Sequence, residues 1–400
     1  MQLARRVLSM SGSATLELTA KIAELRAQGV EVIALGAGEP DFPTPPEAIA
    51  AANAFIARGR VLYTPACGIP ELRAAAAAEL SRSVGITYQP SQVIITNGAK
   101  EGLVLAILAL CQQGDEVLVP TPAWVSYEAI AAIADARMVP LPCSDANGFK
   151  PTPGQLRAAI GPRTRVLILN SPNNPTGAVY SRAELTGLAD ALRGTDVMVV
   201  SDEIYSPFSY GGEHVSPAGI PGMAERTVVV NGVSKSHSMT GWRIGFLGAP
   251  PALVEAVSNL KSHLTSNAAA PSQHAALGAL RGGDGFTITM RAAFAKRLEL
   301  AIDALAAMPG LTLARPEGAF YVFPRIDGFF GETVSSSAEM CRQLLDQQRV
   351  AALPGSAFGD DRFIRFSIAT ADDLLAEGLA RFARYLDTLR VPAGTRSAPR

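Results

Sequence analysis

The sequence predicts an α/β protein with two domains. Its 400 residues, 48% of them hydrophobic, are enough to bury a substantial core, and chains of this length usually form more than one domain. Short apolar runs alternate with longer helical stretches over most of the chain, which is typical of a mainly parallel, buried sheet. Beyond the long helical stretch near residues 286–308 the pattern changes, and this change indicates a smaller second domain.

The expected elements follow this alternation. An apolar helix over residues 99–111 follows the first strand of the large domain. In the last third of the chain, three strand-like segments lie between two helices, which suits a small α+β domain to which the N-terminal helix returns. The strands are expected at 93–96, 116–119, 165–169, 197–201, 227–230 and 244–247 in the large domain, and at 319–323, 350–353 and 363–367 in the small one.

These elements set the expected domain boundaries. Residues 1–45 form an N-terminal segment that joins the small domain, 46–290 the large domain and 291–390 the small domain. The end of the chain, VPAGTRSAPR, has two prolines and no apolar periodicity. We therefore expect residues 391–400 to form a disordered tail.

Composition and charge restrict the class of partner. The 35 basic and 36 acidic residues nearly cancel, and neither sign forms a long run. This balance argues against nucleic acid and membrane surfaces as partners and favours small neutral or anionic metabolites. The first 29 residues lack a signal-peptide core, and no apolar stretch is long enough to cross a bilayer. A reducing cytoplasm is expected because no CxxC spacing occurs among the cysteines, which are Cys67, Cys111, Cys143 and Cys341.

Spacing excludes several other chemistries. The segment VIALGAGEPDF resembles a dinucleotide fingerprint, but Asp41 replaces its third glycine and prolines follow where a phosphate-binding helix would start. There is no HExxH motif and the histidines are scattered, so no metal site is expected. The stretch 258–261 matches SxxK but lacks a KTG partner, so it is interpreted as a solvated helix face.

A single lysine stands in the segment NGVSKSHSMTGWRIG, residues 231–245. Lys235 follows the strand TVVVN in a turn rich in glycine and serine, where an amine can form the Schiff base that attaches pyridoxal phosphate. The pyridine nitrogen of that cofactor needs a carboxylate, and Asp202 ends another apolar strand, with Tyr205 three residues later. The alternative is that Asp202 is an ordinary turn residue at a strand end.

Two further strand ends carry candidate ligands of this cofactor. In SPNNPTG, residues 171–177, Asn174 can donate to the phenolic oxygen, although a plain turn is the alternative. In TNGAKEG, residues 96–102, the backbone of Gly98 and Ala99 and the side chain of Lys100 open a helix that can hold a phosphate. Many helices begin in this way without a ligand, so this segment alone decides nothing.

Together these segments resemble the class I aminotransferases of the pyridoxal-phosphate fold type I superfamily, particularly the bacterial aspartate aminotransferases. The resemblance extends from about residue 4 to residue 385, nearly the whole chain. It implies a large domain with a mainly parallel seven-stranded sheet, a small α+β domain, and a homodimer with shared active sites. The motifs that carry it, in the family's order, are GAGEPDF, YTPACGIPELR, TNGAKE, PTPAWVSY, NSPNNPTGAVY, SDEIY, SKSHSMTGWRIG and RFSIAT.

The resemblance also implies roles for the cofactor-binding residues. Lys235 attaches the cofactor and moves the proton, Asp202 pairs with the pyridinium nitrogen, Tyr205 and Asn174 hydrogen-bond the phenolic oxygen, and Trp124 stacks on the ring. The family often has serine three residues before the lysine, where this chain has glycine. The implied phosphate ligands are Gly98, Ala99, Lys100, Ser234, Arg243 and, from the other subunit, Tyr63.

The implied substrate site depends on Arg365 in RFSIAT. A planar guanidinium can bind the α-carboxylate through two parallel hydrogen bonds, with the Gly38 backbone, Trp124 and Asn174 beside it. An ordinary surface ion pair is the alternative for this arginine. Relatives that accept doubly charged substrates often have a basic residue in the N-terminal segment over the site, whereas residues 11–15 here read SGSAT. The reaction type is therefore implied more directly than aspartate as the amino donor.

The resulting hypothesis is a ping-pong aminotransferase that moves an amino group from an α-amino acid, aspartate-like or broader, to a 2-oxo acid such as 2-oxoglutarate. A second hypothesis keeps the cofactor but redirects the substrate carbanion to elimination, replacement or cyclisation. A third, a non-catalytic effector domain of a transcriptional regulator, lacks the basic DNA-binding module that it needs before Gly36. The sequence does not name the physiological substrate.

Overall fold

The computed structural model describes residues 3, 5–8, 12 and 14–389. Contacts divide the chain into two compact units. Unit 1 contains Glu39–Ala293 and Glu317–Ala319 with the described residues at the start of the chain, and unit 2 contains Gly12–Gly38, Phe294–Pro316 and the residues from Phe320 onwards. The expected tail, 391–400, lies outside the described residues, as do Ser11 and Ser13 of the SGSAT segment.

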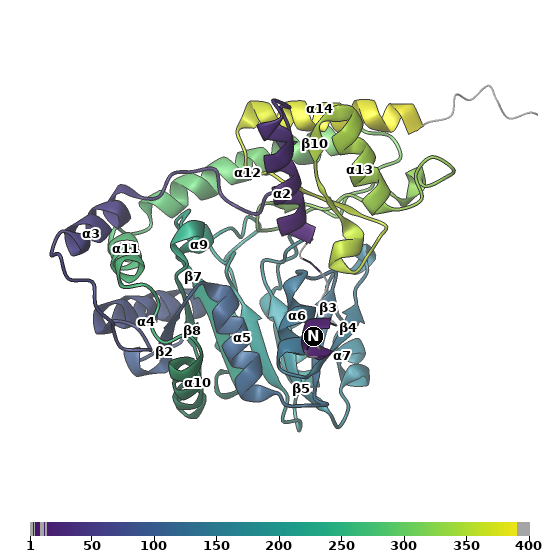
Figure 1. Cartoon of the computed structure of the whole chain (residues 1–400). Coiled ribbons are helices and arrows are strands. Elements are labelled where there is room, and N and C mark those ends of the chain that lie inside the picture. The colour runs from purple at the N-terminus through teal and green to yellow at the C-terminus, as the bar shows by residue number, and fades with distance from the viewer. Residues whose placement is uncertain (1–2, 4, 9–11, 13, 390–400) are drawn as a thin grey trace, which may run out of the picture. The chain divides into compact units, whose positions relative to one another are not determined.

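Unit 1 is built on a seven-stranded sheet (Figure 1) with the strand order β2-β8-β7-β6-β5-β3-β4. The five strands from β7 to β4 are parallel, and β8 runs antiparallel to both of its neighbours. The expected mainly parallel seven-stranded sheet is therefore confirmed. The strands are β2 (Val93–Thr96), β3 (Glu116–Thr121), β4 (Arg137–Pro142), β5 (Thr164–Asn170), β6 (Met198–Asp202), β7 (Thr227–Gly232) and β8 (Gly245–Gly248).

The apolar runs of the sequence predict six of these strands and miss β4. This strand, RMVPLP, lies at the edge of the sheet, and most of its side chains are exposed or only partly buried. An edge strand has a partner on one side alone, so it tolerates the two prolines that make this segment atypical of a strand.

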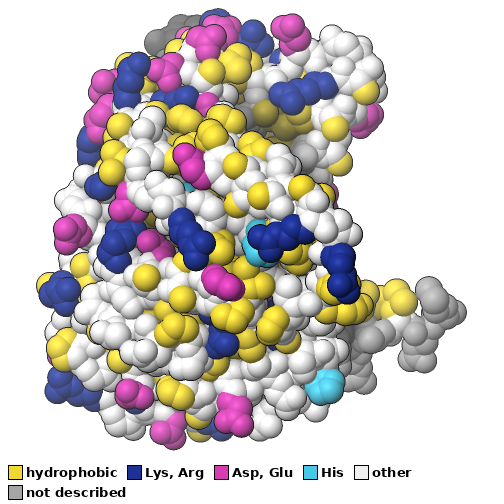
Figure 2. Space-filling model, turned by 90° about the vertical axis from the view of Figure 1, so that its left-hand side faces the viewer, with side chains coloured by type: hydrophobic (Ala, Val, Ile, Leu, Met, Phe, Trp, Pro, Cys, Tyr) yellow, Lys and Arg dark blue, Asp and Glu magenta, His cyan; other side chains and the backbone are white. Residues whose placement is uncertain are grey.

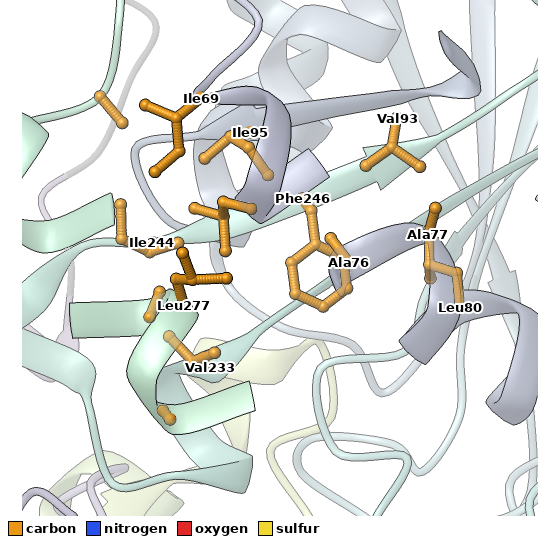
Figure 3. Close-up of a cluster of buried hydrophobic side chains, with 14 of the residues drawn as sticks. Ile69, Ala76, Ala77, Leu80, Val93, Ile95, Val233, Ile244, Phe246 and Leu277 are labelled. Carbon is orange, nitrogen blue, oxygen red and sulfur yellow. The ribbon is translucent and has the colours of Figure 1, made fainter. Parts of the chain in front are cut away.

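Alternate residues of the strands are buried on opposite faces of the sheet. Ile94 and Val230 pack in a cluster with helices α5, α6 and α10, whereas Val93 and Phe246 pack with helices α4 and α11. Figure 3 shows part of this second cluster, where Phe246 lies beside Ala76 of α4. Burial on both faces explains why these strands read as continuous apolar runs.

Local sequence signals set the ends of several helices. Helix α4 begins with Pro70 and ends before Gly85, whose φ of 80° is readily adopted by glycine. Helix α8 begins with a capping box between Ser181 and Glu184. The helices of unit 1 are α1 (Arg5–Leu8), α3 (Pro46–Ile56), α4 (Pro70–Val84), α5 (Ala99–Leu110), α6 (Ser126–Ile133), α7 (Pro153–Ala159), α8 (Arg182–Ala191), α9 (Val233–Ser236), α10 (Pro251–Leu264) and α11 (Ala270–Arg281).

Unit 2 contains two small sheets with helices. Strand β1 (Ile33–Ala34) pairs in parallel with β10 (Val350–Ala351). A second, antiparallel sheet has the order β11-β12-β9. Helix α12 (Gly285–Ala306) begins in unit 1 and continues into unit 2. The remaining elements are α2 (Ala14–Ala27), β9 (Tyr321–Val322), α13 (Ser337–Gln348), β11 (Leu353–Pro354), β12 (Ile364–Ser367) and α14 (Asp372–Leu389).

The described surface mixes charges of both signs. On the face shown in Figure 2, acidic and basic side chains are interspersed among hydrophobic ones, and neither sign covers a continuous area. Among the residues that the structure describes, no helix combines the length and the apolar character needed to span a bilayer.

Candidate active site

Three predicted site residues lie at the same edge of the unit 1 sheet. Asp202 is the last residue of β6, Lys235 lies in α9 directly after β7, and Asn174 follows β5 by four residues. Strands β5, β6 and β7 are neighbours and parallel, and Asp202 is in register with the end of β5. In open α/β sheets, ligands bind at the carboxyl ends of the strands. Figure 1 shows α9 at that end of β7.

Asp202 is a buried carboxyl group held by a tyrosine. Its side chain is 4% exposed, and the Tyr127 hydroxyl donates to its Oδ2 at 2.8 Å. The backbone N–H of Ile204 lies 3.3 Å from its Oδ1. Burial raises the pKa of Asp202 to about 6, although Tyr127, Ile204 and the charge of Lys235 act to lower it. A cation placed at this carboxylate would hold it ionised at neutral pH.

Sequence reasoning missed Tyr127, which lies in α6, three residues after Trp124. Tyr127 is 1% exposed, and its pKa is raised well above the ordinary value by burial and then by Asp202 and Tyr205. The Trp124 ring meets the Tyr127 ring edge-on, with centroids 5.4 Å apart. The only signal for Tyr127 in the sequence was its place in the motif PTPAWVSY.

The loop that carries Asn174 is fixed to the strand that carries Asp202. The backbone N–H of Asn174 donates to Asn170 Oδ1 at 2.9 Å, and Asn170 Nδ2 donates to the carbonyl of Asp202, also at 2.9 Å. Asn174 is buried, as is Tyr205 in the turn after β6. Asn170, the last residue of β5, was not singled out from the sequence. It connects the two strand ends.

Apolar side chains on both sides of Lys235 anchor its segment. Val233, Met239 and Ile244 have no exposed surface, whereas Lys235 is only partly buried. Burial of these neighbours fixes the backbone around the amine and leaves the lysine side chain at the sheet edge. The charge of Lys235 lowers the pKa of Asp202, so the two side chains interact.

The neighbouring backbone requires glycine at position 232. A Cβ atom there would lie 2.8 Å from the Gly245 Cα and 2.9 Å from the Ile244 carbonyl oxygen. Real Cβ contacts are not this short, so the backbone of the neighbouring strand excludes a side chain. Ser234 and Ser236, at 5% and 8% exposure, are the hydroxyl residues on either side of Lys235 in sequence.

Two cations, Lys100 and Arg243, lie at the start of α5. Gly98 precedes the helix with a φ of 77°. Arg243 Nη2 donates to the Asn97 carbonyl at 3.4 Å and Nη1 to the Thr240 carbonyl at 3.1 Å. Burial and then the charge of Arg243 lower the pKa of Lys100. Two cations beside a helix N-terminus form a site suited to a phosphate.

Lys100 also lies close to an aromatic ring. Its Nζ is 4.9 Å from the centroid of the Trp124 ring. Tyr63, by contrast, is 92% exposed. Residues of its own chain therefore do not bury it beside the other predicted site residues.

In unit 2, Arg365 of β12 is a deeply buried cation. It is 2% exposed, and its Nη2 donates to the Gly36 carbonyl at 2.8 Å. Its guanidinium carbon lies 4.3 Å from the Tyr321 ring centroid and 4.9 Å from that of Phe358. The alternative of a surface ion pair is therefore wrong. Gly38 is close to the same tyrosine, because a Cβ on Gly38 would lie 2.9 Å from the Tyr321 hydroxyl.

Comparison with known proteins identifies the family. Residues 30–382 match the family described as aminotransferase class I and II. The chain is 43% identical over 390 residues to the aspartate aminotransferase of Geobacillus stearothermophilus, an alignment that covers 97% of this chain and 99% of that one. The chain belongs to the class I and II aminotransferases.

Two further comparisons place this aminotransferase in the same family. It is 43% identical over 382 residues to the aspartate/prephenate aminotransferase of Cereibacter sphaeroides, covering 93% and 96% of the two chains. The crystal structure of the aspartate aminotransferase from Rhizobium meliloti superposes with a TM-score of 0.92 at 40% identity, over 97% of this chain and 99% of that one. The protein is thus a fold type I enzyme that transfers amino groups with pyridoxal phosphate.

The residues of this aminotransferase fit pyridoxal phosphate. Unit 1 offers an amine in Lys235, a buried carboxyl group in Asp202, and the cationic helix start beside Lys100 and Arg243. These groups match, in turn, the aldehyde, the pyridine nitrogen and the phosphate of the cofactor.

One sequence interpretation is wrong for the aminotransferase. The SxxK stretch in α10 was interpreted as a solvated helix face. Its lysine is buried instead: Lys261 is 0% exposed and its Nζ lies 2.9 Å from Glu101 Oε2. The serine of the same stretch, Ser258, has its Oγ 2.7 Å from Cys67 Sγ. The apolar surroundings of α10 bury the lysine because an acidic partner on α5 compensates its charge.

Proposed function

We propose that this aminotransferase moves the amino group of an aspartate-like α-amino acid to a 2-oxo acid such as 2-oxoglutarate, by a ping-pong mechanism at Lys235. The observation that carries the proposal is the position of Lys235, Asp202 and Asn174 at the ends of three adjacent parallel strands. The names of the relatives, aspartate aminotransferase and aspartate/prephenate aminotransferase, support the choice of donor.

When bound, pyridoxal phosphate supplies an aldehyde for the amino group and a ring that accepts electrons from the substrate. Lys235 Nζ would hold the cofactor, and its amine would carry the proton to and from the substrate α-carbon. The Asp202 carboxylate would keep the pyridine nitrogen protonated. Tyr127 keeps that carboxylate oriented through its hydrogen bond of 2.8 Å.

The other ligands fix the ring and the phosphate. Tyr205 and Asn174 would donate hydrogen bonds to the phenolic oxygen, and Trp124 would contact the ring. Both Tyr205 and Asn174 are buried, so their polar groups are held in place before the cofactor binds. The proposed phosphate ligands are the backbone amides of Gly98 and Ala99 and the side chains of Lys100, Ser234 and Arg243.

Arg365 is proposed to bind the substrate α-carboxylate, with the Gly38 backbone beside it. A buried guanidinium that rests on Tyr321 and Phe358 has little rotational freedom. It therefore presents a fixed pair of donors to a carboxylate. Trp124 and Asn174 are proposed to contact the substrate as well.

The proposed assembly is a homodimer in the cytoplasm. Tyr63 would reach the cofactor phosphate of the partner subunit, since its own chain leaves it 92% exposed. Its neighbours Val61 and Leu62 are also exposed, at 51% and 62%, and such apolar surface favours contact with a second chain. The four cysteines are free thiols, in keeping with a reducing compartment.

Borohydride labelling tests this proposal. Reduction of the yellow holoenzyme followed by peptide mapping should place the pyridoxyl group on Lys235. The variant Lys235→Ala is the control: it should bind the cofactor through the phosphate site without being labelled. A label on Lys100 or Lys261, or on no lysine, would contradict the assignment.

A further inference from the structure

Helix α10 places a fully buried lysine against the first turn of α5. Lys261 is 0% exposed, and its Nζ donates to Glu101 Oε2 at 2.9 Å and to Thr265 Oγ1 at 3.2 Å. The Thr265 hydroxyl in turn donates to Glu101 Oε1. The lysine charge thus has a specific acidic partner, as a buried cation requires.

Glu101 also holds the residue that precedes the anion site. Its Oε2 accepts the backbone N–H of Asn97 at 2.5 Å and its Oε1 accepts Asn97 Nδ2 at 3.1 Å. The Asn97 carbonyl accepts Arg243 Nη2 at 3.4 Å. A continuous chain of contacts therefore runs from Lys261 through Glu101 and Asn97 to Arg243.

The charge on Glu101 acts on the same helix end. Burial acts to raise its pKa, but the hydrogen bonds from Thr265, Lys261 and Asn97 lower it below the ordinary value, so Glu101 is ionised at neutral pH. A carboxylate in the first turn interacts favourably with the helix dipole. Without a compensating cation, it would repel a phosphate bound at that N-terminus.

We propose that Glu101 and Lys261 are positioning residues of the cofactor-phosphate site. Glu101 holds Asn97 and the turn at Gly98, and Lys261 cancels the negative charge that Glu101 would otherwise present to the phosphate. This inference rests on the proposed cofactor site at the start of α5.

The test compares pyridoxal phosphate with pyridoxal, which lacks the phosphate, in equilibrium dialysis against the full-length protein freed of cofactor. Lys261→Met leaves the Glu101 carboxylate uncompensated, so the Kd for pyridoxal phosphate should rise about tenfold or more while that for pyridoxal stays nearly constant. The double variant Lys261→Met/Glu101→Gln removes both charges and should recover most of the lost affinity. Lys150→Met is the matched control, because it breaks another partly buried pair of unit 1, Lys150 with Glu184 at 2.8 Å, and should change neither Kd.

Equal losses for the two ligands, or no recovery in the double variant, would mean that the pair only stabilises the fold and would overturn the inference. If Lys261→Met does not fold, Glu101→Gln gives a test of opposite sign. It removes the charge and keeps the cation, and the amide oxygen of glutamine can still accept the backbone N–H of Asn97. The affinity for pyridoxal phosphate should therefore hold or increase while the Tm falls, and a loss specific to the phosphate would overturn the inference. Wild-type protein that bound both ligands equally well would contradict the proposed phosphate site itself.

Discussion

Two adjacent acids of unit 1, Asp202 and Glu203, are both buried but have different surroundings. Glu203 is 0% exposed and has three side-chain partners. Ser201 Oγ donates to it at 2.8 Å, Ser216 Oγ donates at 2.5 Å, and His214 Nε2 lies 2.9 Å from its Oε2. Neighbours within unit 1 thus occupy both of its carboxylate oxygens.

The Asp202 carboxylate accepts fewer hydrogen bonds from described residues than that of Glu203. Among the described residues, the hydroxyl of Tyr127 donates to its Oδ2, and the backbone N–H of Ile204 lies 3.3 Å from its Oδ1. Its pKa is raised to about 6 by burial. A carboxylate has about four acceptor positions, so Asp202 keeps capacity for a cationic ligand whereas Glu203 is used within the fold. The motif SDEIY alone does not separate these roles.

Exchanging each acid for its amide should separate function from stability. Asp202→Asn removes the anion at the pyridine nitrogen, so at neutral pH kcat should fall by about 10²- to 10³-fold without a loss in the free energy of unfolding. Glu203→Gln should keep kcat and lower the free energy of unfolding by about 1–3 kcal/mol. Steady-state kinetics and denaturant unfolding of both variants measure this. Similar effects of the two exchanges on both quantities would remove the distinction.

Two buried arginines of unit 2 extend the comparison to cations. Arg297 is 8% exposed and its Nε donates to Asp372 at 2.8 Å, whereas Arg365 contacts a carbonyl and two aromatic rings. Arg365→Lys replaces a planar pair of donors by a point charge, so transition-state stabilisation should weaken by about 2–4 kcal/mol. This corresponds to a fall in kcat/KM of about 30- to 900-fold for every amino donor.

The control for this prediction is Arg297→Lys, which should keep kcat/KM. A loss confined to dicarboxylic donors would place Arg365 at the distal end of the substrate instead, and unchanged kinetics would exclude it from the substrate site.

The pH dependence of stability sharpens the description of Asp202. Its folded-state pKa, about 6, lies above the ordinary value of 3.8, so its contribution to stability is complete below pH 4 and is lost as pH rises through 6. Between pH 4 and 7 the cofactor-free protein should lose about 2–3 kcal/mol relative to Asp202→Asn. Denaturant unfolding of the two proteins across this range measures the difference. A constant difference would mean that Asp202 is not desolvated.

Tyr127 should have the smallest effect of this series. Tyr127→Phe removes the hydroxyl donor, so the pKa of Asp202 should rise further and kcat should fall about tenfold, in line with one hydrogen bond to a charged group. The pH–rate profile distinguishes this from a packing defect, since only the lost hydrogen bond moves its acidic limb to higher pH. A profile with unchanged shape would assign Tyr127 to packing alone.

The sequence predicted the parallel sheet and its strand-end residues because both follow from local patterns. Asp202 ends an apolar run, Lys235 and Asn174 follow such runs within four residues, and parallel strands end at one edge. Tyr127 and Lys261 were not predicted, because each acts on a residue far away in sequence: Tyr127 is 75 residues from Asp202 and Lys261 is 160 residues from Glu101. Strand β4 was missed because its two prolines are atypical of a strand and are tolerated only at the sheet edge.

Amino transfer at the strand ends of unit 1 is tested most directly by a half-reaction. L-Aspartate added alone to the yellow holoenzyme should convert the bound cofactor to pyridoxamine phosphate in one turnover, with stoichiometric oxaloacetate and no ammonia. Subsequent addition of 2-oxoglutarate should restore the original absorbance and release glutamate. Release of ammonia together with the oxo acid, and no accumulation of the amine form of the cofactor, would contradict the claim.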